Sequence, residues 1–90
     1  MTPVGLDLSL TSTGISLPDV NTFIASKKKG PGRLVEIRNK VLEYLDPIDS
    51  PVVIIEGYSF GSRNSQAHAT GELGGVIRVA LHERFIPYIE

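Results

Sequence analysis

Apolar and polar residues alternate in short blocks over the first third of the chain. Residues 3–10, 14–17 and 22–26 are each rich in apolar and β-branched side chains, and this pattern predicts three short strands. Polar turn residues separate these strands at residues 9–14 and 18–21. Because the connections are short, the three strands are expected to form an antiparallel meander.

The spacing of apolar positions changes after a basic loop at residues 27–32. Apolar residues then recur at intervals of three and four, as on one face of a helix: Leu34, Ile37, Val41 and Leu45. Asp46 and Pro47 end this predicted helix. A second helix is predicted over residues 65–83, and its apolar stripe consists of Leu73, Val76, Ile77, Ala80 and Leu81.

The first half of this second helix is unusually rich in small residues. Gly71, Gly74 and Gly75 each cost about 0.8–1 kcal/mol of helix propensity relative to Ala. Such a cost predicts a close approach by the sheet, a partner helix or a ligand. The sequence leaves open whether this small-residue face serves dimerisation or packs tightly on the sheet.

Two further strands complete the pattern. Residues 52–57 read Val-Val-Ile-Ile-Glu-Gly, and four consecutive β-branched residues predict a strand buried on both faces. Residues 85–90 predict the last strand. The order strand–strand–strand–helix–strand–helix–strand predicts a single α/β domain over residues 1–90. Its mixed five-stranded sheet has an antiparallel side and a parallel side, because a strand–helix–strand crossover joins parallel strands.

The buried strand ends on Glu56, and that carboxylate needs an explanation. Glu is almost never fully buried unless it is paired or bound to a metal. Asp7 lies at a similar place in the first predicted strand. If the two strands are neighbours, the carboxylates repel each other, and a divalent cation such as Mg²⁺ or Mn²⁺ removes that repulsion. The alternative is structural: Asp7 caps the hairpin turn and Glu56 pairs with an Arg.

The composition excludes several kinds of protein and site. The chain has no Cys, which excludes disulfides and Cys-ligated zinc. No apolar stretch approaches the length of a transmembrane helix, and the first residues lack the pattern of a signal peptide. No membrane partner is therefore expected.

Net charge is −1, but the basic residues are unevenly distributed. Six of the nine Lys and Arg residues lie between positions 27 and 40: Lys27, Lys28, Lys29, Arg33, Arg38 and Lys40. Only Glu36 opposes them there. This cluster is compatible with an edge that contacts phosphates, although charge alone favours a solvated turn and helix face.

Two motifs resemble known proteins. Residues 5–14, Gly-Leu-Asp-Leu-Ser-Leu-Thr-Ser-Thr-Gly, resemble the first hairpin of the RNase H-like superfamily. Residues 53–60, Val-Ile-Ile-Glu-Gly-Tyr-Ser-Phe, followed by the Gly-rich residues 71–77, resemble the RuvC-type Holliday junction resolvases, particularly their phage-encoded relatives. The order of the predicted elements agrees with that fold across the whole chain. The resemblance therefore implies an RNase H-like fold.

The resemblance implies a Mg²⁺- or Mn²⁺-dependent endonuclease that resolves four-way DNA junctions or other branched DNA in recombination and repair. Asp7 matches the first catalytic Asp of the family and Glu56 its second acidic ligand, so both are candidate catalytic and metal-binding residues. A homodimer is implied, because a resolvase cuts two strands symmetrically. The implied location is the cytoplasm of a bacterium or of a phage-infected cell.

The resemblance also marks candidate DNA contacts. Residues 58–64 match the segment that approaches DNA near the crossover, where Tyr58 or Phe60 would stack on an unpaired base or pack over the sheet end. The basic loop and the first hairpin turn are further candidates. The full set of candidate DNA-binding residues is Thr11, Lys27, Lys28, Lys29, Arg33, Tyr58, Phe60, Arg63 and Asn64.

The chain departs from the family's pattern after its fifth predicted strand. Family members continue into a basic segment and a final helix that carries the remaining acidic ligands, whereas this sequence stops at Glu90. We therefore expect an incomplete domain without the C-terminal helix, a weak metal site and a poor or inactive nuclease. We also expect one uncovered sheet face.

Three other functions compete with the nuclease. Residues 57–61 fit the G-x-S-x-G nucleophile elbow of hydrolases, with His68 and His82 as the available histidines. The hairpin at residues 7–14 also resembles the phosphate-binding turn of sugar kinases and actin-like ATPases. The third alternative is a non-catalytic DNA- or protein-binding domain of the same fold.

Overall fold

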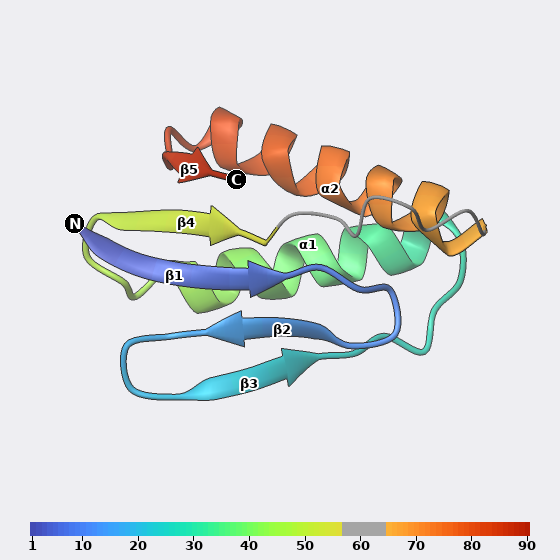
Figure 1. The fold of residues 1–90 in the computed structure, drawn as a ribbon, viewed down its shortest axis with the longest axis horizontal. Helices are drawn as coiled ribbons and strands as arrows, with labels where there is room; N and C mark the ends of the chain where they lie inside the picture. Colours follow the sequence, from blue (N-terminus) through green and yellow to red (C-terminus); the bar gives the residue numbers. More distant parts are fainter. Residues whose placement is uncertain (57–64) are drawn as a thin grey trace.

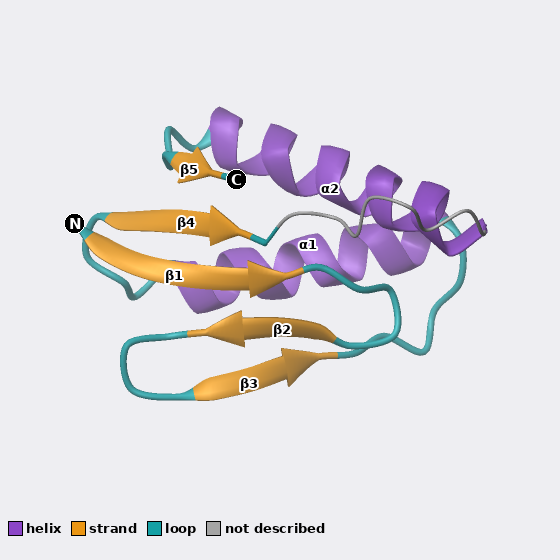
Figure 2. Cartoon of the chain, in the orientation of Figure 1, coloured by secondary structure: helices purple, strands orange, loops and turns teal. Residues whose placement is uncertain are grey.

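The structure is a computed structural model that describes residues 1–56 and 65–90, with side chains for residues 1–56 and 71–90. Within these described residues, five strands form one sheet in the order β3-β2-β1-β4-β5 (Figure 1). Along the chain the elements are β1 (Thr2–Asp7), β2 (Thr13–Ser16), β3 (Asn21–Ile24), α1 (Pro31–Leu45), β4 (Pro51–Ile55), α2 (Ser65–Glu83) and β5 (Tyr88–Ile89). The predicted order of elements and the predicted fold class are confirmed (Figure 2).

The strand directions follow the predicted topology. β1, β2 and β3 pair antiparallel as a meander, and β1 pairs parallel with β4. β4 in turn pairs parallel with β5 through the α2 crossover. The first strand therefore lies at the centre of the sheet, where the antiparallel and parallel sides meet.

Both helices pack on the same face of the sheet. The inward residues of α1 and α2 join alternate residues of the central strands in one buried cluster. The helices contribute Ile37, Val41, Leu45, Leu73, Ile77 and Leu81, and the strands contribute Val4, Leu6, Ile15, Ile24, Val53 and Ile55. Among the described helices, none is long and apolar enough to cross a membrane.

The opposite sheet face carries no helix in the described part of the chain. The prediction that β4 is buried on both faces is therefore wrong, because only Val53 and Ile55 point into the core. Ile54 is 39% exposed, and Glu56 directly after the strand is exposed as well. Here this surface is called the open face; its uncovered state was expected from the sequence.

Two of the α2 glycines have open space beside them. An added Cβ at Gly71 or Gly75 would meet no described atom within 4 Å, so no close approach by the described part of the chain accounts for these two glycines, whereas Gly74 is buried. Gly75 instead lines a shallow groove between the helices, together with Leu34 and Val79.

The end of α2 shortens the last predicted strand. Phe85 N–H donates to the His82 carbonyl at 3.1 Å, and Ile86 N–H donates to the Leu81 carbonyl at 2.9 Å. This pair of bonds is the Schellman motif, which requires a left-handed residue, and Phe85 supplies it with φ 57°. Phe85 and Ile86 thus cap the helix, and β5 is confined to Tyr88–Ile89.

Replacing Phe85 with Gly should stabilise the domain. The left-handed conformation strains a residue with a Cβ, and the Phe85 side chain is 94% exposed, so almost no packing is lost. We expect Phe85→Gly to raise the free energy of unfolding by about 1 kcal/mol in urea denaturation. Phe85→Ala keeps the strain and serves as the control. An equal gain in both variants would contradict this account of the helix end.

Candidate active site

Asp7 and Glu56 lie side by side on neighbouring strands. β1 and β4 pair in parallel up to Leu6 and Ile55, and the Glu56 N–H donates to the Leu6 carbonyl at 2.9 Å. The next position on each strand is a carboxylate, and neighbouring strands lie about 4.8 Å apart. The structure therefore brings together the two carboxylates that the sequence predicted as a site.

The alternation of side chains along the strands sets which way these carboxylates face. Val4 and Leu6 are buried, so Gly5 and Asp7 belong to the open face. Asp7 and Glu56 are both exposed, and they line the same cavity of about 170 Å³. The premise that Glu56 is a buried carboxylate is wrong, because the helices cover the other face.

Among the described residues, no cation neutralises either carboxylate. Within the described residues, no hydrogen bond or ion pair to the side chain of Asp7 or Glu56 is found. The alternative pairing of Glu56 with an Arg therefore has no support in the described part of the chain. Two adjacent, unpaired carboxylates repel each other in the absence of a cation.

The residues present fit part of a hard-cation site. Carboxylate oxygens are the ligands that Mg²⁺ and Mn²⁺ prefer, and Mg²⁺ commonly takes one or two carboxylates, with water and phosphate oxygens as its other ligands. Gly14 opposes Asp7 on β2 and leaves room beside it, since an added Cβ would lie 3.6 Å from the Asp7 Cβ. The described residues include no cluster of three or more acidic, His or Cys side chains, so they would supply two protein ligands.

The first hairpin turn is held by its own hydroxyl groups. The Thr13 hydroxyl is fully buried; it donates to the Ser9 carbonyl at 2.6 Å and accepts from the Ser9 N–H at 3.2 Å. The exposed Thr11 shares a hydrogen bond of 3.0 Å with the Ser9 hydroxyl. Thr11 therefore lies on a hydrogen-bonded turn that follows β1, at the sheet end where Asp7 lies.

The basic loop leaves the sheet at this same end. β3 runs in the direction of β1, so residues 25–29 follow from the sheet end that carries Asp7 and Glu56 (Figure 1). Lys27 and Lys29 are exposed there. The structure thus places the predicted phosphate-contacting lysines and the two carboxylates at one end of the sheet.

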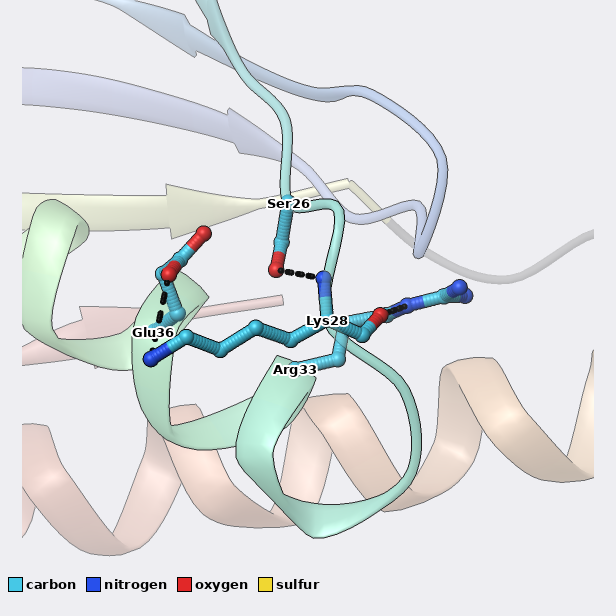
Figure 3. Close-up of polar contacts among 4 residues, drawn as sticks. All are labelled: Ser26, Lys28, Arg33 and Glu36. Carbon is cyan, nitrogen blue, oxygen red and sulfur yellow. Dashed lines mark hydrogen bonds and ion pairs between the residues drawn. The ribbon is translucent and has the colours of Figure 1, made fainter.

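Lys28 and Arg33 have structural contacts that the sequence did not reveal. The Lys28 ammonium pairs with the Glu36 carboxylate at 3.4 Å, and Arg33 Nε donates to the Lys28 carbonyl at 2.8 Å (Figure 3). Ser26 Oγ accepts from the Lys28 N–H at 3.1 Å. These contacts fasten the loop to the first turns of α1.

Glu36 is held in its charged form by this arrangement. A hydrogen bond from Ser26 lowers the pKa of Glu36 below its ordinary value of 4.5, and partial burial opposes that shift. A hydrogen bond and the charge of Lys28, with the charge of Lys40, lower the pKa further. The contact between loop and helix is therefore intact at neutral pH.

Comparison with solved structures shows the same architecture in RuvC of Thermus thermophilus. A structure of RuvC in complex with a Holliday junction substrate matches with a TM-score of 0.82 and 23% sequence identity. It covers 98% of this chain and 62% of the RuvC chain. A second Thermus thermophilus RuvC structure matches with a TM-score of 0.78 at 22% identity, covering 98% of this chain and 61% of its own.

The chain has a RuvC-like fold. The predicted resemblance to RuvC-type proteins is confirmed at the level of the fold. The chain spans about three-fifths of the length of the RuvC structures that it matches. No family model and no curated protein matches the sequence.

Several predicted DNA-binding residues lie outside the described part of this RuvC-like chain. These are Tyr58, Phe60, Arg63 and Asn64. Ser59 and the side chain of His68, on which the hydrolase alternative depends, also lie outside it. His82 is described, and it lies about 25 Å along α2 from Ser65, because each helical residue adds about 1.5 Å. His82 is therefore remote from the sheet end where an elbow would follow β4.

The sequence reasoning gave no role to Phe23, Ser16 and Asn21, which are among the residues that line the cavity of Asp7 and Glu56. Phe23 of β3 is 70% exposed on the open face and borders the cavity. Ser16 and Asn21 form another part of its wall, where the Ser16 hydroxyl donates to Asn21 Oδ1 at 2.8 Å. The available signal was the alternation of β3, because the burial of Ile24 implies an outward Phe23.

The titration of Glu36 tests the loop contacts directly. We expect its pKa, measured by NMR titration of the side-chain carboxyl, to lie below 4.5 and to rise in Ser26→Ala and in Lys28→Ala. Because the pKa is lowered on folding, the stabilising effect is present at neutral pH and disappears as pH falls through the pKa of the folded state. Glu43→Gln, a change elsewhere on α1, is the control. An unchanged Glu36 titration in both loop variants would contradict these contacts.

Proposed function

We propose that this chain is the catalytic-core part of a RuvC-like, metal-dependent endonuclease that acts on branched DNA such as four-way junctions. One observation carries the proposal: two carboxylates, Asp7 and Glu56, adjoin at the carboxyl ends of neighbouring parallel strands, and no described residue pairs with either of them. Open α/β sheets place their ligands at such strand ends. The fold matches a RuvC that was solved with a Holliday junction substrate, which supports branched DNA as the substrate class.

In this proposal each described group has a limited role. Asp7 and Glu56 hold a divalent cation at the open face, and the cation, when bound, supplies Lewis-acid activation of water and of the scissile phosphate. Hydrolysis joins the water oxygen to phosphorus and breaks the bond to the 3′-oxygen, which leaves as a hydroxyl. Lys27 and Lys29 bind neighbouring phosphates of the DNA and thereby keep the DNA backbone at the site. Two such sites in a homodimer would cut two strands.

A second candidate function is DNA binding without cleavage. The small number of acidic ligands favours this function. Only two carboxylates adjoin at the site among the described residues, whereas hydrolysis with two metal ions commonly uses more than two. Both functions share the basic loop and the open face. Cleavage, rather than binding, separates them.

Loss of either carboxylate should abolish cleavage if the chain is a nuclease. We expect Asp7→Asn and Glu56→Gln each to lower the rate of four-way-junction cleavage in Mg²⁺ or Mn²⁺ at least about 100-fold. Even the loss of a residue that only orients a metal ligand typically lowers metal affinity or activity by about 10–100-fold. Binding of the junction should fall much less than cleavage. The rates are measured by gel separation of end-labelled strands.

Asp19→Asn is the matched control for the carboxylate variants. Asp19 is an exposed carboxylate in the turn between β2 and β3, at the opposite end of the sheet. This variant should cleave like the unaltered chain. Junction binding without cleavage by the unaltered chain would favour the binding function, and cleavage that survives both Asp7→Asn and Glu56→Gln would refute the proposed site.

Release of Lys28 should strengthen DNA binding through the basic loop. Glu36→Gln removes the partner that holds the Lys28 ammonium at 3.4 Å, so one more cation is free to contact phosphate. We expect tighter junction binding in fluorescence anisotropy, and a salt dependence steeper by up to about 0.9 in the slope of log K against log salt. Glu43→Gln makes the same charge change farther along α1. Identical behaviour of the two variants would contradict a role for the loop.

A further inference from the structure

We propose that Phe23 is a nucleotide-contacting residue of this site, whose ring stacks on a base adjacent to the phosphate bound at Asp7 and Glu56. This inference rests on the proposed function and adds to it a residue for which the sequence resemblance gave no role. It concerns β3, the edge strand on the antiparallel side of the sheet.

Phe23 lies in one row with the candidate catalytic Asp. The strand registers pair Asp7 with Gly14 and Gly14 with Phe23, so the three residues cross the sheet in line. All three lie on the open face and line the same cavity as Glu56. Two strand spacings separate Asp7 from Phe23, about 9–10 Å between the strand axes. A single nucleotide can span such a distance from its phosphate to its base.

Gly14, the middle residue of the row, has no side chain between the Phe23 ring and the Asp7 carboxylate. An added Cβ at Gly14 would lie 3.6 Å from the Asp7 Cβ and 3.7 Å from Cε1 of the Phe23 ring. The ring therefore reaches over the backbone of β2 toward Asp7, and no side chain separates the two. Any strand whose phosphate binds at Asp7 would pass beside this ring.

Packing of the Phe23 ring over Gly14 explains the contacts of only one side of that ring. An aromatic residue opposite a strand glycine protects the backbone, which is a structural role. Phe23 nevertheless stays 70% exposed, more than Ile54 or Ile89 on the same face, which are 39% and 58% exposed. Its ring thus offers an apolar surface within a cavity that carries two carboxylates and the Asn21 amide. This combination suits a nucleotide, which presents an aromatic base and a charged phosphate together.

The aromatic character of residue 23 distinguishes stacking from simple coverage. Phe23→Leu keeps an apolar side chain over Gly14 but removes the π face, whereas Phe23→Tyr and Phe23→Trp keep it. We expect Phe23→Leu and Phe23→Ala to weaken binding of a four-way junction roughly tenfold or more, as loss of one base stack does. Binding is measured by anisotropy of labelled DNA in Ca²⁺, and Phe23→Tyr should bind like the unaltered chain. Thermal melts establish that each variant is folded.

Fluorescence gives a second readout that affinity alone does not supply. The chain has no Trp, so Phe23→Trp introduces a single reporter at the site. We expect its emission to be quenched on addition of the junction, while Ile89→Trp stays unquenched on the same face outside the cavity. Normal affinity in Phe23→Leu, or equal quenching at positions 23 and 89, would overturn the inference about Phe23. Failure of the unaltered chain to bind the junction would instead refute the proposed function, and with it this contact.

Discussion

The parallel pairing of β1 with β4 is the constraint on which the rest of the structure depends. It joins the beginning of the chain to a strand that starts at Pro51, and it places both strands at the centre of the sheet. Its register puts Val4, Leu6, Val53 and Ile55 into the core together. The same register leaves Asp7 and Glu56 adjacent on the open face. A shift of β4 by one residue would turn Glu56 toward the helices, where an unpaired carboxylate is costly.

The packing of the helices on one face determines what the other face can do. Because α1 and α2 bury the inward residues, the outward residues of the sheet remain accessible in the described part of the chain. Asp7, Glu56 and Phe23 then lie at or near the carboxyl ends of β1, β4 and β3. The basic loop follows β3 at the same sheet end and is fastened to α1 through Lys28 and Glu36. Asp7 and Glu56 thus share one end of the sheet with Lys27 and Lys29, and no ion pair joins these two groups within the described residues.

Apolar periodicity predicted the order of helices and strands well. It failed to predict which sheet face is covered, because tertiary packing determines that. The spacing of Leu34, Ile37 and Val41 gave the first helix, and residues 52–57 gave the central strand. That same β-branched run carries no information on which face of the strand is covered, so β4 was wrongly predicted to be buried on both faces. Glu56 was found because it ends a predicted strand, and Asp7 because it stands at a similar place in the first predicted strand, which in the structure ends at Asp7. Their exposure was not predictable, because it depends on where the helices pack.

Contacts between side chains were the least predictable part of the site. The pairing of Lys28 with Glu36 depends on the path of the loop before Pro31, which no local pattern encodes. Phe23 was treated only as a strand former, because apolar residues in strands usually face a core. The left-handed Phe85 was missed for a related reason: helix ends favour Gly there, and an aromatic residue gives no such signal.

The central claim is that Asp7 and Glu56 hold one cation between them, and paramagnetic NMR tests it most directly. In a titration with Mn²⁺, the amide signals of Asp7 and Glu56 should broaden together at the same metal concentration. In Asp7→Asn, both should require a much higher concentration, because each carboxylate supplies part of one site. Independent broadening of the two signals, with Glu56 unaffected by Asp7→Asn, would contradict the account.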